Sequence, residues 1–310
     1  MHRRKIQLVG GSSYTISLPK EWVIKNKLKE KDEVTIHEKS DKTLVIGEEK
    51  VDKLKEIEFN VDEYSNIKQV IFGAYYIGIE KIILKSKKEI SKKDKINVRK
   101  AIRYMSGTEI VYEDNKKIIV AVLLDKAKVD VKQTMYRISL IIEDSAHNII
   151  DGLNLKEMIV NEQEIDRLYQ LLTKMISLAS INSNVLSSSN IKNTIKIPSY
   201  FLISKKLENI GDTLYYLSKY LNKKKIRKID FGKVLQELVD ELKKATRFII
   251  SKNIKMYESK HQEDFKKEID KIKDVTIYNH LHDIRRYVKD VSEEIANLSF
   301  YRELISKGNL

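Results

Sequence analysis

The sequence LENIGDTLYYLSKYL at residues 207–221 carries the clearest fold signal in this chain. Steps of three and four separate its apolar residues, which are Leu207, Ile210, Leu214, Leu217 and Leu221. This spacing is typical of one helix packed among other helices. Glu208 and Asp212 fall near the opposite side of that helix, one turn apart. Gly211 costs about 1 kcal/mol relative to alanine inside a helix, so we expect a neighbouring helix to approach closely there.

Five more segments carry an apolar stripe at helical spacing, and each must therefore pack on neighbours. They are residues 132–153, 161–186, 231–258, 261–274 and 276–306, with the segment that contains Leu207–Leu221 running from Pro198 to about Asn222. The stripe of the fourth helix includes Met256. The sequence thus predicts an all-α region over residues 127–310, built from two sets of three helices.

A second pair of acids, Glu162 and Asp166, lies one helix upstream of Glu208 and Asp212. Two Glu-x-x-x-Asp motifs on consecutive helices, with Ile-Gly inside the second, resemble the PhoU family of phosphate uptake regulators. The resemblance implies two three-helix units and a surface metal site formed by all four acids. It implies iron or zinc, although carboxylates would equally accept Mg²⁺, Mn²⁺ or Ca²⁺. The alternative is helix-surface charge paired with lysines, worth about 0.3–0.5 kcal/mol per pair.

The second set of helices departs from this motif. Leu281-His282-Asp283-Ile284-Arg285-Arg286 aligns with the segment that begins at Leu207, so His282 replaces Glu208 and Arg286 replaces Asp212. A cation at a ligand position repels a metal ion, and we therefore expect a single site, in the first set.

Residues 1–50 have the pattern of a small β module. A basic lead precedes strands at Ile6–Leu8 and Tyr14–Leu18, a short helix follows Pro19 to Lys27, and a hairpin turns at Ser40-Asp41-Lys42. The hairpin strands are Val34–Ile36 and Leu44–Ile46. A module of this size buries too little apolar surface to be stable alone, so we expect it to dimerise.

The string RRKIQLVGGSSYTISLPKEWVIKNKLKEKDEVTI, residues 3–36, is similar to the SpoVT/AbrB family. That resemblance implies an interleaved, swapped-hairpin β-barrel in a homodimer that binds double-stranded DNA. By position it implies DNA contacts from Arg3, Arg4, Lys5, Lys20 and Lys25. Arginine and lysine neutralise backbone phosphates, and arginine also reads guanine. The alternative is a dimerisation module whose basic residues are only solvated.

Residues 51–126 predict a small α/β layer in the order βαβαββ, with helices on one face of a sheet. The expected strands are residues 57–61, 81–85, 109–112 and 117–124, and the expected helices are residues 63–77 and 91–105. Gly73 and Gly78 are too sparse for a phosphate-binding loop. In archaeal-type phosphate uptake regulators a connector of this kind lies between AbrB-like and PhoU-like parts, and the order of parts here is similar.

Composition narrows the possible functions. The chain has no cysteine, which excludes thiolate metal sites and cysteine nucleophiles, and its net charge is +14. No apolar run approaches the roughly 20 residues that span a bilayer. Together with the two family resemblances, which imply the regulatory role, the sequence predicts a cytoplasmic, multidomain α+β regulator of phosphate uptake rather than an enzyme. The alternative is a scaffold that does not bind DNA and instead acts on a phosphate transporter or its sensor kinase through the helical region.

Overall fold

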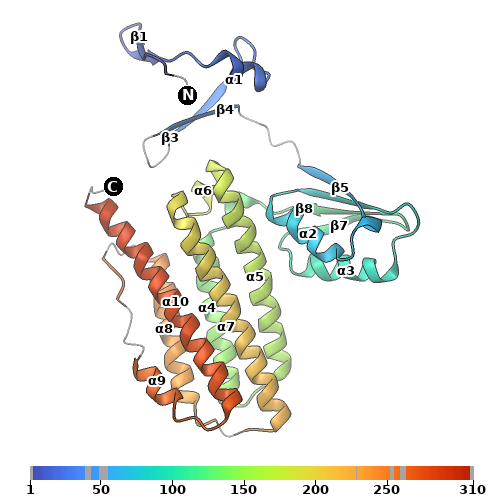
Figure 1. Ribbon diagram of the computed structural model, residues 1–310, viewed down its shortest axis with the longest axis vertical. Helices are drawn as coiled ribbons and strands as arrows, with labels where there is room; N and C mark the ends of the chain where they lie inside the picture. The colour runs from blue at the N-terminus through green and yellow to red at the C-terminus, as the bar shows by residue number, and fades with distance from the viewer. Residues whose placement is uncertain are drawn as a thin grey trace. The chain divides into compact units, whose positions relative to one another are not determined.

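The computed structural model describes residues 3–38, 43–48, 55–227, 229–251, 255–258 and 263–307. Its contacts divide the chain into two compact units, residues 1–53 and residues 54–310. Figure 1 shows short strands and one short helix in the first unit, and a sheet layer and long helices in the second. The expected α+β class is confirmed at this level.

The first unit consists of two separate antiparallel ladders and one helix. β1 (Gln7–Val9) pairs with β2 (Ser13–Thr15), and β3 (Val34–Glu38) pairs with β4 (Leu44–Glu48). α1 (Lys20–Lys25) follows Pro19, whose backbone carbonyl accepts a hydrogen bond from Val23 N. The predicted hairpin turn at Ser40-Asp41-Lys42 lies outside the described residues.

The described residues of this unit contain no buried side chain, and many of its apolar residues face solvent. Tyr14 is 75% exposed, Ile6 is 71% exposed and Ile36 is 60% exposed. β2 is also shorter than the predicted strand Tyr14–Leu18. Within the described part of one chain, the four strands do not close a barrel.

The second unit begins with the predicted α/β layer. Its strands are β5 (Glu56–Asn60), β6 (Lys81–Lys85), β7 (Thr108–Glu113) and β8 (Lys117–Val122), in the sheet order β5-β6-β8-β7. β5 and β6 run parallel, and the other pairs are antiparallel. α2 (Ile67–Tyr76) and α3 (Lys92–Arg103) pack side by side on one face of the sheet (Figure 1). The side chains of Asn66 and Ser91 cap the N-termini of the two helices. The helices end at Tyr76 and Arg103, slightly before the predicted ends at residues 77 and 105.

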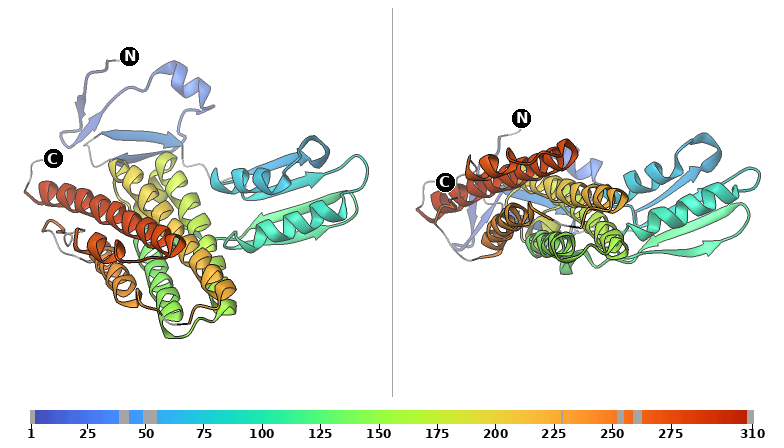
Figure 2. Two further views of the ribbon diagram at one scale, coloured as in Figure 1. Left: turned by 60° about the horizontal axis from the view of Figure 1, so that its bottom comes forward. Right: turned by 90° about the horizontal axis from the view of Figure 1, so that it is seen from below.

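The rest of the unit is helical. The long helices are α4 (Val131–Asp151), α5 (Leu155–Ile181), α7 (Ile197–Lys224), α8 (Gly232–Ile250) and α10 (Val275–Ser306), with short α6 (Ser183–Ser188) and α9 (Glu263–Ile269) between them. They share one continuous apolar core. Viewed along the bundle, α10 lies against α7 and α8, while α4 and α5 close the opposite side (Figure 2). No described helix is both long and apolar enough to cross a membrane.

Several predicted helix boundaries were wrong. The helix predicted over residues 161–186 does not run to residue 186, because the extended backbone of Asn182 separates α5 from α6. The helix predicted over residues 261–274 ends at Ile269, and the helix predicted from residue 63 begins at Ile67.

α5 begins at Leu155 rather than at residue 161, because the side chain of Asn154 caps it by accepting from the amides of Lys156 and Glu157. α8 ends at Ile250 rather than at residue 258, because the backbone of Ser251 is extended. Met256, expected on the apolar stripe, therefore lies outside the helix and is 49% exposed.

The α/β layer packs against the helical bundle where α2 contacts α5. The ammonium of Lys174, 1% exposed, donates to the Tyr75 carbonyl over 3.0 Å and lies 4.1 Å from the Tyr75 ring centroid. The Tyr76 hydroxyl donates to Gln170, and Arg167 donates to Ser106 Oγ over 2.6 Å. The sheet layer and the helices consequently form one unit.

Candidate functional site

The candidate site lies where α5 and α7 come closest. A Cβ atom added at Gly211 would lie 2.8 Å from Ile165 Cδ1 and 3.1 Å from Ile165 Cγ2. Both residues are buried in the core between the two helices. The expected close approach at Gly211 is therefore confirmed, and it brings the acid-bearing faces of α5 and α7 together.

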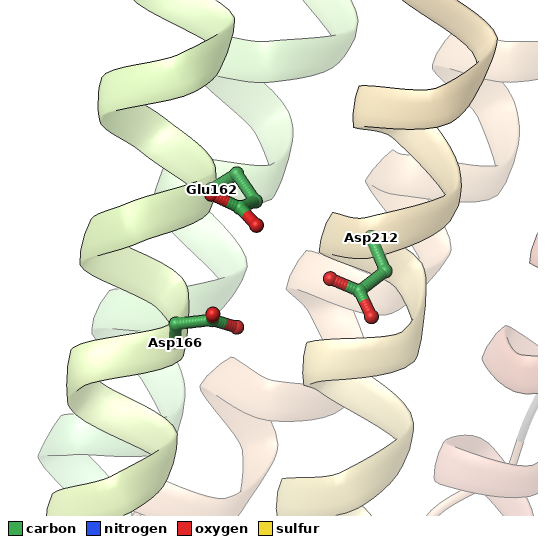
Figure 3. Close-up of side chains that lie close together, drawn as sticks. All are labelled: Glu162, Asp166 and Asp212. Carbon is green, nitrogen blue, oxygen red and sulfur yellow. The ribbon is translucent and has the colours of Figure 1, made fainter. Parts of the chain in front are cut away.

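Three of the four predicted ligands converge across this contact. Glu162 and Asp166 on α5 face Asp212 on α7 (Figure 3), and each offers an oxygen within 4.8 Å of the other two. The fourth acid, Glu208, forms an ion pair with Lys205 one turn before it. The structure thus gathers Glu162, Asp166 and Asp212 into one group and ties Glu208 to a lysine.

Burial and mutual repulsion make these acids hard to ionise. Burial, followed by the charges of Glu162, Asp212 and Glu208, raises the pKa of Asp166 to about 7. Burial and the neighbouring acids also raise the pKa of Glu162, and burial raises the pKa of Asp212. Burial raises the pKa of Glu208 too, although its hydrogen bond from Lys205 opposes the rise. All four side chains are half-buried, whereas the sequence favoured a site fully at the surface.

The α/β layer contributes two tyrosines to the surroundings of the acids. Burial raises the pKa of the Tyr104 hydroxyl, and the nearby charges of Glu162 and Asp166 raise it further. Burial raises the pKa of Tyr76 to about 12, with smaller contributions from Tyr169, Glu208 and Asp166. The sequence analysis missed both tyrosines, since no local pattern indicates that α2 and α3 lie beside α5.

A cationic cavity of about 360 Å³ adjoins this group. It is lined by Lys68, Lys100, Arg103, Tyr104 and Gln163, so it lies between the α/β layer and α5. Gln163 follows Glu162 directly in the sequence. Three cations of the α/β layer thus line a cavity next to the helix that carries Glu162 and Asp166.

The acid group has the chemistry of a cation site. Carboxylate oxygens are the preferred ligands of hard divalent ions, and three of them from two helices can share one ion. A bound cation would also relieve the repulsion that raises the pKa of Asp166. In the second set of helices, Arg286 donates to Asp283 over 3.0 Å, which is consistent with the expected loss of ligands there.

The predicted DNA-contacting residues all lie on the surface of the first unit. Arg3, Arg4 and Lys5 immediately precede β1, and Lys20 and Lys25 begin and end α1. All five side chains are exposed. The structure leaves their charges accessible to a polyanion.

Comparison with known families supports the resemblance of the N-terminal residues. Residues 7–55 match a family model described as antidote-toxin recognition MazE, bacterial antitoxin. The matched range includes Lys20 and Lys25, whereas Arg3, Arg4 and Lys5 precede it. No curated protein and no solved structure matches the chain. The part of the chain that carries the acid group is not covered by the match.

Proposed function

We propose that this chain is a DNA-binding transcriptional regulator of phosphate uptake that dimerises through residues 1–50 and senses a metal ion through its helical region. The observation that carries the proposal is the first unit itself. It resembles SpoVT/AbrB domains, it has a basic surface, and its apolar side chains have no core of their own. A second copy would cover them.

Dimerisation explains the solvent exposure of this unit. Ile6, Leu8, Tyr14 and Ile36 belong to strands or lie directly beside them, and each is more than half exposed. Exposed apolar area of this extent marks an interface in a soluble protein. Two copies that exchange their hairpins would bury these residues in the shared swapped-hairpin barrel that the family resemblance implies.

The dimer would present its basic residues to the DNA backbone. Arg3, Arg4 and Lys5 form a continuous cationic lead to β1, and Lys20 adds a charge at the start of α1. Each neutralised phosphate releases counterions, so binding of this kind weakens steeply as salt rises. Lys25, at the other end of α1, would contribute less.

The helical region would supply the regulatory input. Glu162, Asp166 and Asp212 would hold the ion, and Glu208 would join them only by leaving Lys205. The ion would supply positive charge that binds the faces of α5 and α7 together. The link to phosphate uptake rests on the PhoU resemblance of the paired acid motifs, and the proposal assigns no catalytic step to them.

Removing two basic residues tests DNA binding. The double substitution Arg4→Ala and Lys5→Ala should weaken binding to a duplex by at least tenfold and flatten the dependence of binding on salt, because two phosphates per protomer lose their partners. Fluorescence anisotropy of a labelled duplex at two salt concentrations measures both quantities. The control is Lys29→Ala with Lys31→Ala, which removes equal charge from the loop after α1. An unchanged salt slope in the Arg4/Lys5 variant would rule out phosphate contacts by these residues.

Removing two acids tests the metal site. Glu162→Gln with Asp212→Asn should lower the affinity for Mn²⁺ or Zn²⁺ by more than a hundredfold, since one carboxylate of the group remains. Equilibrium dialysis followed by elemental analysis gives the bound metal per chain. The charge-matched control is Glu157→Gln with Asp240→Asn, two exposed acids outside the group. Equal metal content in the two variants would remove the assignment.

A second candidate function is recognition of a protein partner by the first unit. The description of the matching family names toxin recognition, and this wording favours a role in protein binding. In that case the barrel would dimerise a scaffold, and the helical region would act on a phosphate transporter or a sensor kinase. If the anisotropy of a labelled duplex mixed with the whole chain does not depend on salt concentration, this candidate is favoured over DNA binding.

A further inference from the structure

A second cavity lies where α4 begins and α8 and α10 end. Its volume is about 320 Å³, and its polar lining includes Asp130, Lys132, Asn190, Lys192, Ser251 and Arg302. It shares Ile249 and Arg302 with a smaller neighbouring hollow that Lys196 and Tyr200 line. No member of the acid group lines either hollow.

Three cations, Lys132, Lys192 and Arg302, line this cavity, and a fourth, Lys196, lines the neighbouring hollow. Within the described residues, Lys132, Lys192 and Lys196 form no ion pair. The Lys196 ammonium lies 5.0 Å from the Tyr301 ring centroid. Arg302 donates to the backbone carbonyls of Ser251 and Ile249, which fixes its guanidinium at the rim.

The one acid in the lining is already occupied. Asp130 Oδ1 accepts from the backbone amides of Lys132 and Gln133 at the start of α4, and Oδ2 accepts from Asn190. Asp130 therefore caps the helix rather than pairing with a lysine. The positively charged side chains that line the cavity therefore outnumber its single carboxylate.

The cations are close enough for each positive charge to disfavour the protonated form of its lysine neighbours. Burial, followed by the charges of Arg302 and Lys196 and then of Lys192, lowers the pKa of Lys132 to about 8, although the charge of Asp130 opposes the shift. Burial and the charges of Arg302 and Lys192 likewise lower the pKa of Lys196. The loop that carries Lys192 is also strained, because Asn190 and Lys192 adopt φ values of +65° and +67°. Packing gives no reason for this arrangement, whereas a bound anion would stabilise it.

We propose that the cavity between α4, α8 and α10, together with the hollow beside it, binds a small phosphate-bearing anion, either inorganic phosphate or a phosphomonoester, through Lys132 and Lys192 in the cavity and Lys196 in the hollow. Lysines are point-charge donors suited to a multivalent oxyanion. The side chain of Arg302 closes one wall without leaving the carbonyls it binds. A cavity of about 320 Å³ also leaves room for a small organic group beside the phosphate. This site is independent of the function proposed above.

Titration calorimetry of the full chain tests the site with inorganic phosphate in one arm and glycerol 3-phosphate in the other. We expect saturable binding in at least one arm at 150 mM salt, and tighter binding in one arm identifies free phosphate or the ester as the better ligand. The double variant Lys132→Met and Lys196→Met keeps the aliphatic packing and removes two charges. It should bind at least tenfold more weakly.

The matched control is Lys128→Met with Lys233→Met, which removes the same charge from lysines whose side chains are 83% and 91% exposed. This control should bind like the unaltered chain. A thermal melt adds a second readout, because phosphate should raise the melting temperature of the control and not of the cavity variant. Absence of saturable binding in both arms, or equal weakening in the two double variants, would overturn the proposal. Neither outcome bears on DNA binding by the first unit.

Discussion

Replacing Gly211 with valine is expected to destabilise the folded protein by about 3 kcal/mol, at the upper end of the usual cost of overpacking. The added Cβ would lie 2.8 Å from Ile165 Cδ1. That atom is the flexible end of a side chain, so a single methyl group could be accommodated by a small rotation. The two Cγ atoms of valine could not, because Ile165 is buried between α5 and α7. Urea unfolding followed by circular dichroism measures the change.

Gly73 provides the matched control. It also lies within a helix, α2, but no atom lies within 4 Å of the position that its Cβ would occupy. Gly73→Ala should therefore raise the free energy of unfolding by about 0.5–1 kcal/mol through helix propensity alone. If Gly211→Val left the stability unchanged, α5 and α7 would not approach as closely as the structure shows, and the acid group would lose its geometric basis.

Local patterns were sufficient to predict most of the helical region. α7 and α10 follow their apolar stripes almost to the residue, because a stripe at steps of three and four has only one way to face a core. Gly211 was informative for the same reason, since an unexplained glycine inside a good helix implies a close neighbour. The end of α8 was not predictable, because it depends on Arg302, more than fifty residues further along the chain, which binds the carbonyls of Ile249 and Ser251.

The environment of the candidate site was beyond the reach of sequence patterns. The four acids were found from their spacing, but their burial was not, because it arises from packing of the α/β layer on α5. Lys205 could have been noticed three residues before Glu208. Nothing local connects Tyr104 or Lys68 to the acids. The cationic cavity gathers residues from three separate segments, and the cavity at the start of α4 gathers residues from four. Such clusters are products of the tertiary fold.

Replacing Asp166 with asparagine is expected to stabilise the metal-free protein at pH 8. Burial and the neighbouring acids raise the pKa of Asp166 from 3.8 to about 7. An acid whose pKa is raised on folding binds more protons in the folded state, so the stability of the unaltered protein falls as pH rises from about 4 to about 7. Each pKa unit corresponds to about 1.4 kcal/mol. Solvent screening of this half-buried group reduces the expected gain to about 2 kcal/mol.

Unfolding by urea at pH 4 and pH 8, in the presence of a chelator, separates this effect from simple loss of a side chain. The gain from Asp166→Asn should be about 2 kcal/mol at pH 8 and well under 1 kcal/mol at pH 4, where the carboxyl is protonated in the folded state and about half protonated in the unfolded state. Asp240→Asn, at an exposed position on α8, should show no such difference between the two pH values. Adding Mn²⁺ at pH 8 should reverse the order, because an ion that binds only the folded state stabilises the unaltered acid group and not the variant. A gain of the same size at both pH values would show that Asp166 is not held among ionised neighbours.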